Sequence, residues 1–263
     1  YLCAFPEPEA WLVLSNHQEY TKGLCVLFCL DKDPAMEIWH GRRAGPSQAK
    51  QQYPINLAFA LDELDEQLLD LIDGHQNIYF AQGHNHDADD LVFSLLQALR
   101  DAPKQSKQAP CSLIDVRIIL DEMRLIKSAN EIEMMRQAAS IATQAHIRAM
   151  KFVEAGKNEY HLEAEIHHEF AMQGAKYPAY GTIVGAGDNA CILHYTENNQ
   201  DLKFGDLVLI DAGCEWQGYA SDITRTFPVS GIFSIEQKQL YQLVLDAQLA
   251  AFDMIKPNNT IKQ

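Results

Sequence analysis

The chain contains 263 residues, of which 47% are hydrophobic and 22% are charged, and its formal net charge is −15. These fractions are ordinary for a soluble globular protein and exclude a disordered or collagen-like chain. The negative charge disfavours nucleic acid as a partner, because binding to phosphates needs clustered Lys and Arg side chains. The longest apolar run, at 24–30, is much shorter than the about 20 residues that cross a bilayer, so we expect no membrane partner either.

The six cysteines are too sparse for a disulfide scaffold and include no Cys-x-x-Cys pair. We therefore expect reduced thiols and a cytoplasmic protein. The first residues lack the basic region and the long apolar core of a signal peptide. Residue 1 is tyrosine rather than methionine, which indicates a processed chain or a piece of a longer one.

The first part of the chain predicts short strands in a meander, followed by alternating helices and strands, which together indicate a mixed α/β domain. Polar residues at 16–22 separate the first two strands, and a polar stretch at 101–110 with two prolines predicts a loop near a domain boundary. The predicted strands are 10–15, 24–30, 37–40 and 77–81, and the predicted helices are 55–72 and 89–100.

The second part opens with a helix start, because Ser128 and Glu131 have the spacing of a capping box. Apolar residues at intervals of three and four then predict a helix that ends near Gly156. The further predicted elements are helices at 160–172 and 235–255 and strands at 182–184, 192–195, 207–212 and 219–227.

Two aspartates lie on neighbouring predicted strands. The apolar run Leu207 to Ile210 predicts a buried strand that ends in Asp211, and the next strand carries Asp222. The residues 215–218 between them predict a type I turn with glycine at its last position. A hairpin folded about this turn places Asp211 opposite Asp222, with Cβ atoms roughly 4.5 to 5.5 Å apart.

Like charges at that distance are destabilising unless the two carboxylates share a proton or hold a cation. All-oxygen ligation suits Mn²⁺ or Mg²⁺ rather than a thiolate zinc site, and two such carboxylates can bridge two metals. The alternative is a different register, in which one aspartate is simply solvated. Both interpretations stay open on spacing alone.

The stretch 194–228 resembles the pita-bread metallopeptidases, because the spacing of Asp211 and Asp222 is followed by Ile223-Thr-Arg-Thr-Phe-Pro228. Within that family the chain is most similar to Xaa-Pro aminopeptidases (the aminopeptidase P group). The supporting segments are 165–170, 174–178, 182–185, 191–198 and 209–215, with 5–10 and 37–43 in the first part. The resemblance implies an N-terminal creatinase-like (RNase H-like) α/β domain at 1–124, incomplete at its start. It also implies the first half of a pita-bread catalytic domain at 125–263.

The resemblance also implies roles for five residues of this sequence. Asp211 would chelate one Mn²⁺ and Asp222 would bridge two, while the Tyr180 side chain would hydrogen-bond the network of metal ligands. His194 would bind the substrate or the tetrahedral intermediate. Trp39 would reach the active site of a neighbouring subunit in a homotetramer. The implied reaction is metal-dependent hydrolysis of the bond before a proline in second position, with a metal-bridging hydroxide as the nucleophile.

The family needs three further metal ligands, one histidine and two glutamates, which the resemblance places beyond residue 263. We therefore expect a fragment that lacks peptidase activity by itself. Two other interpretations stay open. The parent protein could be a prolidase that takes only Xaa-Pro dipeptides, or the chain could be a non-catalytic pita-bread module retained for binding or assembly.

Overall fold

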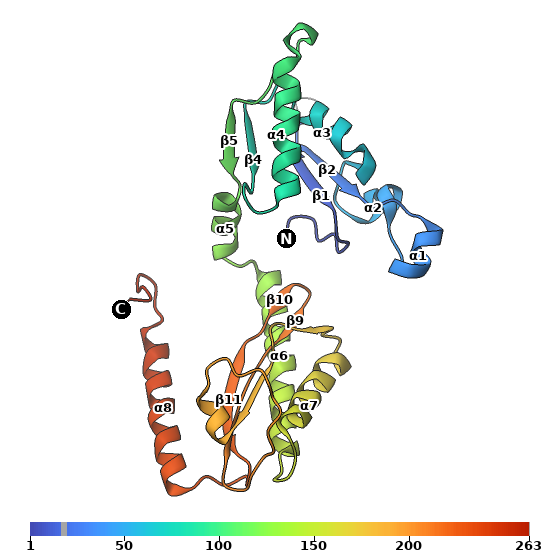
Figure 1. Cartoon of the computed structure of the whole chain (residues 1–263). Coiled ribbons are helices and arrows are strands. Elements are labelled where there is room, and N and C mark those ends of the chain that lie inside the picture. The colour runs from blue at the N-terminus through green and yellow to red at the C-terminus, as the bar shows by residue number, and fades with distance from the viewer. Residues whose placement is uncertain (17–19, 263) are drawn as a thin grey trace. The chain divides into compact units, whose positions relative to one another are not determined.

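The computed structural model describes residues 1–16 and 20–262 (Figure 1). Residues 17–19, within the predicted polar stretch 16–22, lie outside the described residues. The chain divides into two units, Tyr1–Leu125 and Ile126–Gln263. The expected domain bounds, 1–124 and 125–263, stay a prediction. In the described ranges no helix is long and apolar enough to span a membrane.

The first unit is a mixed α/β structure with two small sheets. Strand β1 (Trp11–Ser15) pairs antiparallel with β2 (Leu24–Cys29), and β2 pairs parallel with β3 (Leu57–Ala60). Strand β4 (Asn77–Phe80) pairs parallel with β5 (Ser112–Asp115). The predicted meander is therefore wrong, because the third strand is reached by a crossover and runs parallel to β2.

Helices connect these strands. The α-helices are α1 (Pro34–His40), α2 (Gly45–Gln52), α3 (Leu64–Ile72), α4 (His86–Asp101) and α5 (Arg117–Leu125). Short 3-10 helices lie at η1 (Leu61–Glu63) and η2 (Pro103–Gln105). Helix α4 confirms the predicted helix at 89–100, and β1, β2 and β4 confirm three of the four strands predicted here.

The predicted strand at 37–40 is wrong, because these residues belong to α1. The carboxylate of Asp33 accepts hydrogen bonds from the amides of Ala35 at 2.8 Å and Met36 at 3.3 Å, and Pro34 follows it. An aspartate N-cap followed by proline is a strong helix start. Trp39 therefore lies on a helix, where 80% of its surface is exposed.

The predicted helix at 55–72 is only half correct, since β3 precedes α3. Leu57 and Phe59 pack in one apolar cluster, whereas Ala58 between them packs in another on the opposite face of the sheet. This alternation is the period of a strand. The sequence pattern is ambiguous because Leu57, Leu61 and Leu64 also fit helical spacing.

The second unit packs two helices against one face of an antiparallel sheet (Figure 1). The helices are α6 (Ala129–Phe152) and α7 (Glu159–Met172), and the sheet has the order β11 (Ile223–Pro228), β8 (Leu207–Ala212), β7 (Ile183–Ala186). A smaller sheet has the order β10 (Tyr219–Ala220), β9 (Cys214–Trp216), β6 (Tyr177–Pro178). The 3-10 helix η3 (Gly187–Cys191) follows β7, and α8 (Ile235–Met254) comes last.

Small residues on α6 let this helix approach α7 and the sheet closely. Ala138, Ala142, Ala145 and Ala149 are fully buried in a core that also contains large aliphatic and aromatic side chains. The capping box at the start of α6 is confirmed. Ser128 donates its amide to the Glu131 carboxylate at 2.7 Å and accepts the Glu131 amide at 3.4 Å.

The predicted strand at 192–195 is wrong. Residues 192–194 form a bend and turn directly after η3, and only Tyr195 among them is buried. The predicted strand at 219–227 is interrupted, because β10 and β11 are separated by Ser221 and Asp222. The mixed α/β class is confirmed, and the site now depends on how β8 and β11 pair.

Candidate metal centre

Strand β8 carries the first aspartate on the face of the sheet opposite to the helices. Val208, Ile210 and Ala212 are buried in the core, whereas the alternate residues, which include Asp211, are only half-buried. The period of two along a strand therefore points the Asp211 carboxylate away from the core. Its direct neighbours are Ile183 in β7 and Thr224 in β11.

The observed register differs from the predicted one by two residues. Asp211 lies opposite Thr224 rather than Asp222, and Trp216 pairs with Tyr219 across the turn. Both residues inside that turn have positive φ, 50° at Gln217 and 84° at Gly218. A two-residue turn of this kind is the type I′ turn of tight hairpins, which matches the twist of the strands better than the predicted type I turn.

A shift of two residues leaves a side chain on the same face of a sheet. Asp222, which precedes β11, is therefore a diagonal rather than a direct neighbour of Asp211. The close approach of the two strand segments requires Gly213, because a Cβ atom there would lie 1.7 Å from the Ser221 carbonyl oxygen. Diagonal placement keeps the two carboxylates close without the direct contact that the first register implied.

Tyr180 joins the two carboxylates. Its hydroxyl lies 2.6 Å from Asp211 Oδ1 and 3.1 Å from Asp222 Oδ1. A phenol has one proton to donate, so it can satisfy only one of these oxygens at a time. Burial and the hydrogen bond to Asp211 raise the pKa of Tyr180 well above its ordinary value, so the hydroxyl remains protonated. The two carboxylates therefore share one hydrogen-bond donor, and their oxygens keep lone pairs that can accept further bonds.

The donor chemistry of Asp211 and Asp222 fits a divalent metal ion that prefers oxygen ligands. Two side chains do not complete a coordination sphere. Within residues 1–16 and 20–262 no group of three or more His, Cys, Asp or Glu side chains could hold a metal ion. The geometry is that of part of a metal site.

The other two predicted site residues are His194 and Trp39. His194 is exposed in the turn after η3 and makes no hydrogen bond with either carboxylate in the described part of the chain. Trp39 belongs to the first unit. Hydrogen bonds thus unite Tyr180, Asp211 and Asp222.

Sequence reasoning missed His146, which supports β8 from behind. This side chain of α6 is 2% exposed, and its Nε2 lies 3.2 Å from the carbonyl oxygen of Ala212. Burial lowers the pKa of His146 below its ordinary value, which favours the neutral ring. The sequence could have indicated this residue, because His146 lies between Ala145 and Ala149 on the alanine-rich face of α6.

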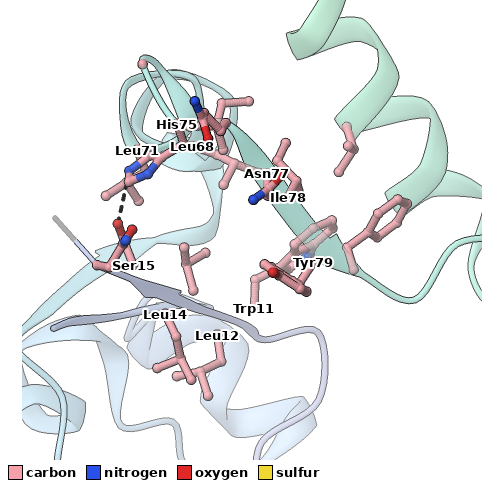
Figure 2. A pocket seen from close by; sticks show the side chains of 17 residues that line it. Trp11, Leu12, Leu14, Ser15, Leu68, Leu71, His75, Asn77, Ile78 and Tyr79 are labelled. Atoms are coloured by element: carbon pink, nitrogen blue, oxygen red, sulfur yellow. Dashed lines mark hydrogen bonds between the residues drawn. The ribbon is translucent and has the colours of Figure 1, made fainter. Parts of the chain in front are cut away.

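A cavity of about 660 Å³ lies in the first unit. Figure 2 shows its lining by β1, β4 and the end of α3, with Trp11, Leu14 and Tyr79 among the side chains. A hydrogen bond of 3.2 Å between Ser15 Oγ and His75 Nε2 spans part of it. None of the predicted site residues lines this cavity.

Comparison with known proteins places the site in a family. Residues 133–263 match metallopeptidase family M24, and residues 1–79 match the aminopeptidase P N-terminal domain. The chain is 47% identical over 261 residues to an Xaa-Pro aminopeptidase of Escherichia coli (strain K12), covering 99% of this chain and 59% of that protein. It is 43% identical to the Xaa-Pro aminopeptidase of Haemophilus influenzae, covering 100% of this chain and 58% of that protein.

Solved structures that are similar to this chain are also aminopeptidases of the P type. Proline aminopeptidase P II from Yersinia pestis has 51% identity and a TM-score of 0.90, over 94% of this chain and 56% of that one. The aminopeptidase PepP of Pseudomonas aeruginosa has 50% identity and a TM-score of 0.93, over 97% of this chain and 57% of that one. The chain thus spans somewhat more than half the length of these relatives. The chain belongs to the M24 metallopeptidases and carries an N-terminal domain of the aminopeptidase P type.

Proposed function

We propose that the chain is part of an Xaa-Pro aminopeptidase, which releases the N-terminal residue from peptides that have proline in second position. The observation that carries this proposal is the convergence of Asp211 and Asp222 on the hydroxyl of Tyr180. Family membership and 47% identity to an Xaa-Pro aminopeptidase support it. Since the chain spans 59% of that relative, the activity is proposed for a longer protein that contains it.

Asp211 and Asp222 are the residues of this chain that would hold the metal. Asp211 would hold one Mn²⁺ and Asp222 would be shared with a second, while the three remaining ligands would come from outside residues 1–263. When bound, the metal supplies Lewis acidity and a water of lowered pKa. The choice of Mn²⁺ rests on the oxygen donors of Asp211 and Asp222, and one solved structure of E. coli aminopeptidase P is zinc-substituted.

Three further residues of the chain would position the carboxylates or contact the substrate. The Tyr180 hydroxyl lies 2.6 Å from Asp211 and 3.1 Å from Asp222, and a hydrogen bond to either carboxylate restrains its orientation. His194 would bind the substrate, and its exposure in a turn leaves the imidazole accessible. Trp39 would contact the active site of a neighbouring subunit in a homotetramer, and its 80% exposure on α1 supports this role.

A cytoplasmic location belongs to the same proposal. The six cysteines are all free, and Cys29 and Cys214 are buried. Reduced thiols are the usual state of cysteines in a reducing compartment. Nucleic acid does not enter the proposal as a partner, since the net charge is −15, and a membrane does not enter it, since the longest apolar run is at 24–30.

Substitution in a longer active protein tests the metal assignment. We expect Asp222→Asn to abolish hydrolysis of an Xaa-Pro-Xaa tripeptide, because an amide cannot bridge two cations as a carboxylate does. Asp188→Asn is the matched control, since Asp188 is an exposed aspartate in η3 of the same unit. An unchanged kcat in Asp222→Asn refutes the bridging role.

The choice of substrate separates the two enzymatic interpretations. An aminopeptidase cleaves Xaa-Pro-Xaa tripeptides, whereas a prolidase cleaves only Xaa-Pro dipeptides. Activity on the dipeptide alone overturns the proposal in favour of the prolidase. If the longer protein binds Mn²⁺ but cleaves neither peptide, the non-catalytic module is the correct interpretation.

A further inference from the structure

One buried carboxylate of the second unit takes no part in the metal centre. Glu159 is the first residue of α7 and has no exposed surface. A charge is buried in this way only where several hydrogen-bond donors replace water, and the positive end of a helix dipole adds to them. The donors around Glu159 therefore indicate which part of the structure this side chain organises.

Four donors surround the two carboxylate oxygens. Oε1 accepts from the amide of Ala186 at 2.7 Å and from Asn189 Nδ2 at 3.2 Å. Oε2 accepts from the hydroxyl of Tyr195 at 2.8 Å and from the amide of Gln200 at 2.9 Å. Burial and the hydrogen bond to Glu159 raise the pKa of Tyr195, so its hydroxyl stays protonated and can donate.

These donors all lie on one connected segment of the chain. Ala186 is the last residue of β7, Asn189 lies in η3, and Gln200 comes where the segment returns to the start of α7. The backbone amide of Glu159 also donates to the Gln200 carbonyl at 3.0 Å. A single residue therefore fastens both ends and the middle of the segment 187–200, which we name the η3 loop.

A second buried residue fastens the η3 loop to β7. Asn198 is 3% exposed and adopts a positive φ of 45°. Its Oδ1 accepts from the Val184 amide at 2.9 Å, and its Nδ2 donates to the Thr182 carbonyl at 2.8 Å and to Glu163 at 3.0 Å. The loop is thus held from two sides, and His194 lies between these anchors, next to the buried Tyr195.

We propose that Glu159 is a positioning residue that sets the conformation of the η3 loop and thereby the place of His194. The inference rests on the proposed function only where it concerns His194 as the group that binds substrate. Among the described residues, the side-chain hydrogen bonds of Glu159 go to Ala186, Asn189, Tyr195 and Gln200 and to neither metal ligand, so we expect it to act through the loop.

Glu159→Gln removes the charge and keeps the shape of the side chain. A glutamine has one acceptor oxygen, and its NH₂ group must replace either Oε1 or Oε2. The NH₂ group then faces the amide of Ala186 in one orientation and the amide of Gln200 in the other. Because both partners are main-chain donors that cannot be reversed, one end of the η3 loop is released in either case.

Hydrogen exchange of the 263-residue chain tests the structural half of the proposal. We expect amides of the η3 loop to exchange at least about tenfold faster in Glu159→Gln, while those of β8 stay unchanged. Glu163→Gln is the matched control, because it lies one turn further along α7 and its amide oxygen can still accept from Asn198. An unchanged loop, or an equal increase in β8, overturns the proposal.

Kinetics of a longer active protein test the functional half. A displaced catalytic group costs on the order of 100-fold in rate, so we expect Glu159→Gln to lower kcat/KM by that factor while Mn²⁺ affinity stays the same. The effect should disappear in a His194→Ala background, since the two changes act through one side chain. Additive losses overturn the positioning of His194.

A second variant tests the role of Glu159 if Glu159→Gln does not fold, and hydrogen exchange tests it independently of peptidase activity. If Glu159→Gln does not fold, Tyr195→Phe is used instead, because it removes one of the donors to Glu159. The proposal then requires faster hydrogen exchange that is confined to the η3 loop. If the longer protein cleaves no Xaa-Pro peptide, the proposed function fails, whereas the exchange experiment still decides whether Glu159 holds the loop.

Discussion

Gly213 is the residue whose replacement should damage the second unit most directly. It lies where β8 leaves the main sheet and enters the smaller one, beside Ser221. In Gly213→Ala the new Cβ atom would lie 1.7 Å from the Ser221 carbonyl oxygen and 3.1 Å from Cε1 of Tyr180. Real Cβ contacts stay beyond 3.0 Å, so the two backbones must separate by more than 1 Å.

The cost follows from the nature of the contact. The opposing atom is a backbone oxygen in a paired segment, which cannot rotate away as a side chain can. Overpacking usually costs about 1 to 3 kcal/mol, and we expect the upper end here. The unfolding temperature of the second unit should fall by on the order of 10 °C.

Urea unfolding followed by the fluorescence of Trp216 measures this loss. Trp11 and Trp39 are replaced by phenylalanine in every variant, so that the signal comes from the second unit alone. Gly181→Ala is the control, because a Cβ atom there meets nothing within 4 Å and its φ is ordinary. A loss below about 1 kcal/mol in Gly213→Ala would refute the requirement for close approach at this position.

Three further predictions concern the same unit. Ser128→Ala removes the N-cap of α6 and should lower the unfolding free energy by about 1 kcal/mol, measured by urea unfolding against Ser230→Ala. Burial lowers the pKa of His146 in the folded chain, so at pH values below 6.5 the unfolded chain binds more protons at this side chain than the folded chain does. Stability should therefore decrease progressively below pH 6.5, and a smaller decrease in His146→Phe would confirm the source. Calorimetry of the 263-residue chain should show only weak Mn²⁺ binding, and tight binding of two ions would contradict the incomplete ligand set.

The elements that could be predicted from sequence are those with a local physical signature. The apolar run of β8 and the capping box at Ser128 each determine their structure within a few residues, and both predictions are confirmed. The prediction of a strand at 37–40 was wrong, although the residues before it contain a local signal for a helix. Asp33 and Pro34 form a helix start, but the aromatic and aliphatic residues after them resemble a strand.

Contacts distant in sequence could not be predicted in this way. The register of Asp211 depends on whether Gln217 adopts positive φ, and a glutamine gives little indication that it will. The four donors around Glu159 come from residues 27 to 41 positions away. A pattern read along the chain contains no information about such partners until the fold brings them together.

Helix α8 has a consequence for the dynamics of the chain. Its N-terminus is well fastened, since Ser234 and Gln237 form a capping box and Gln237 also donates to the Gly205 carbonyl at 2.9 Å. Beyond that point α8 buries no residue of its 20. Most of a helix's stability in a protein comes from the packing of one face, and α8 has only a few half-buried side chains. In the 263-residue chain α8 should therefore unfold locally, from its C-terminal end, at a free energy far below that of the alanine-lined core around α6.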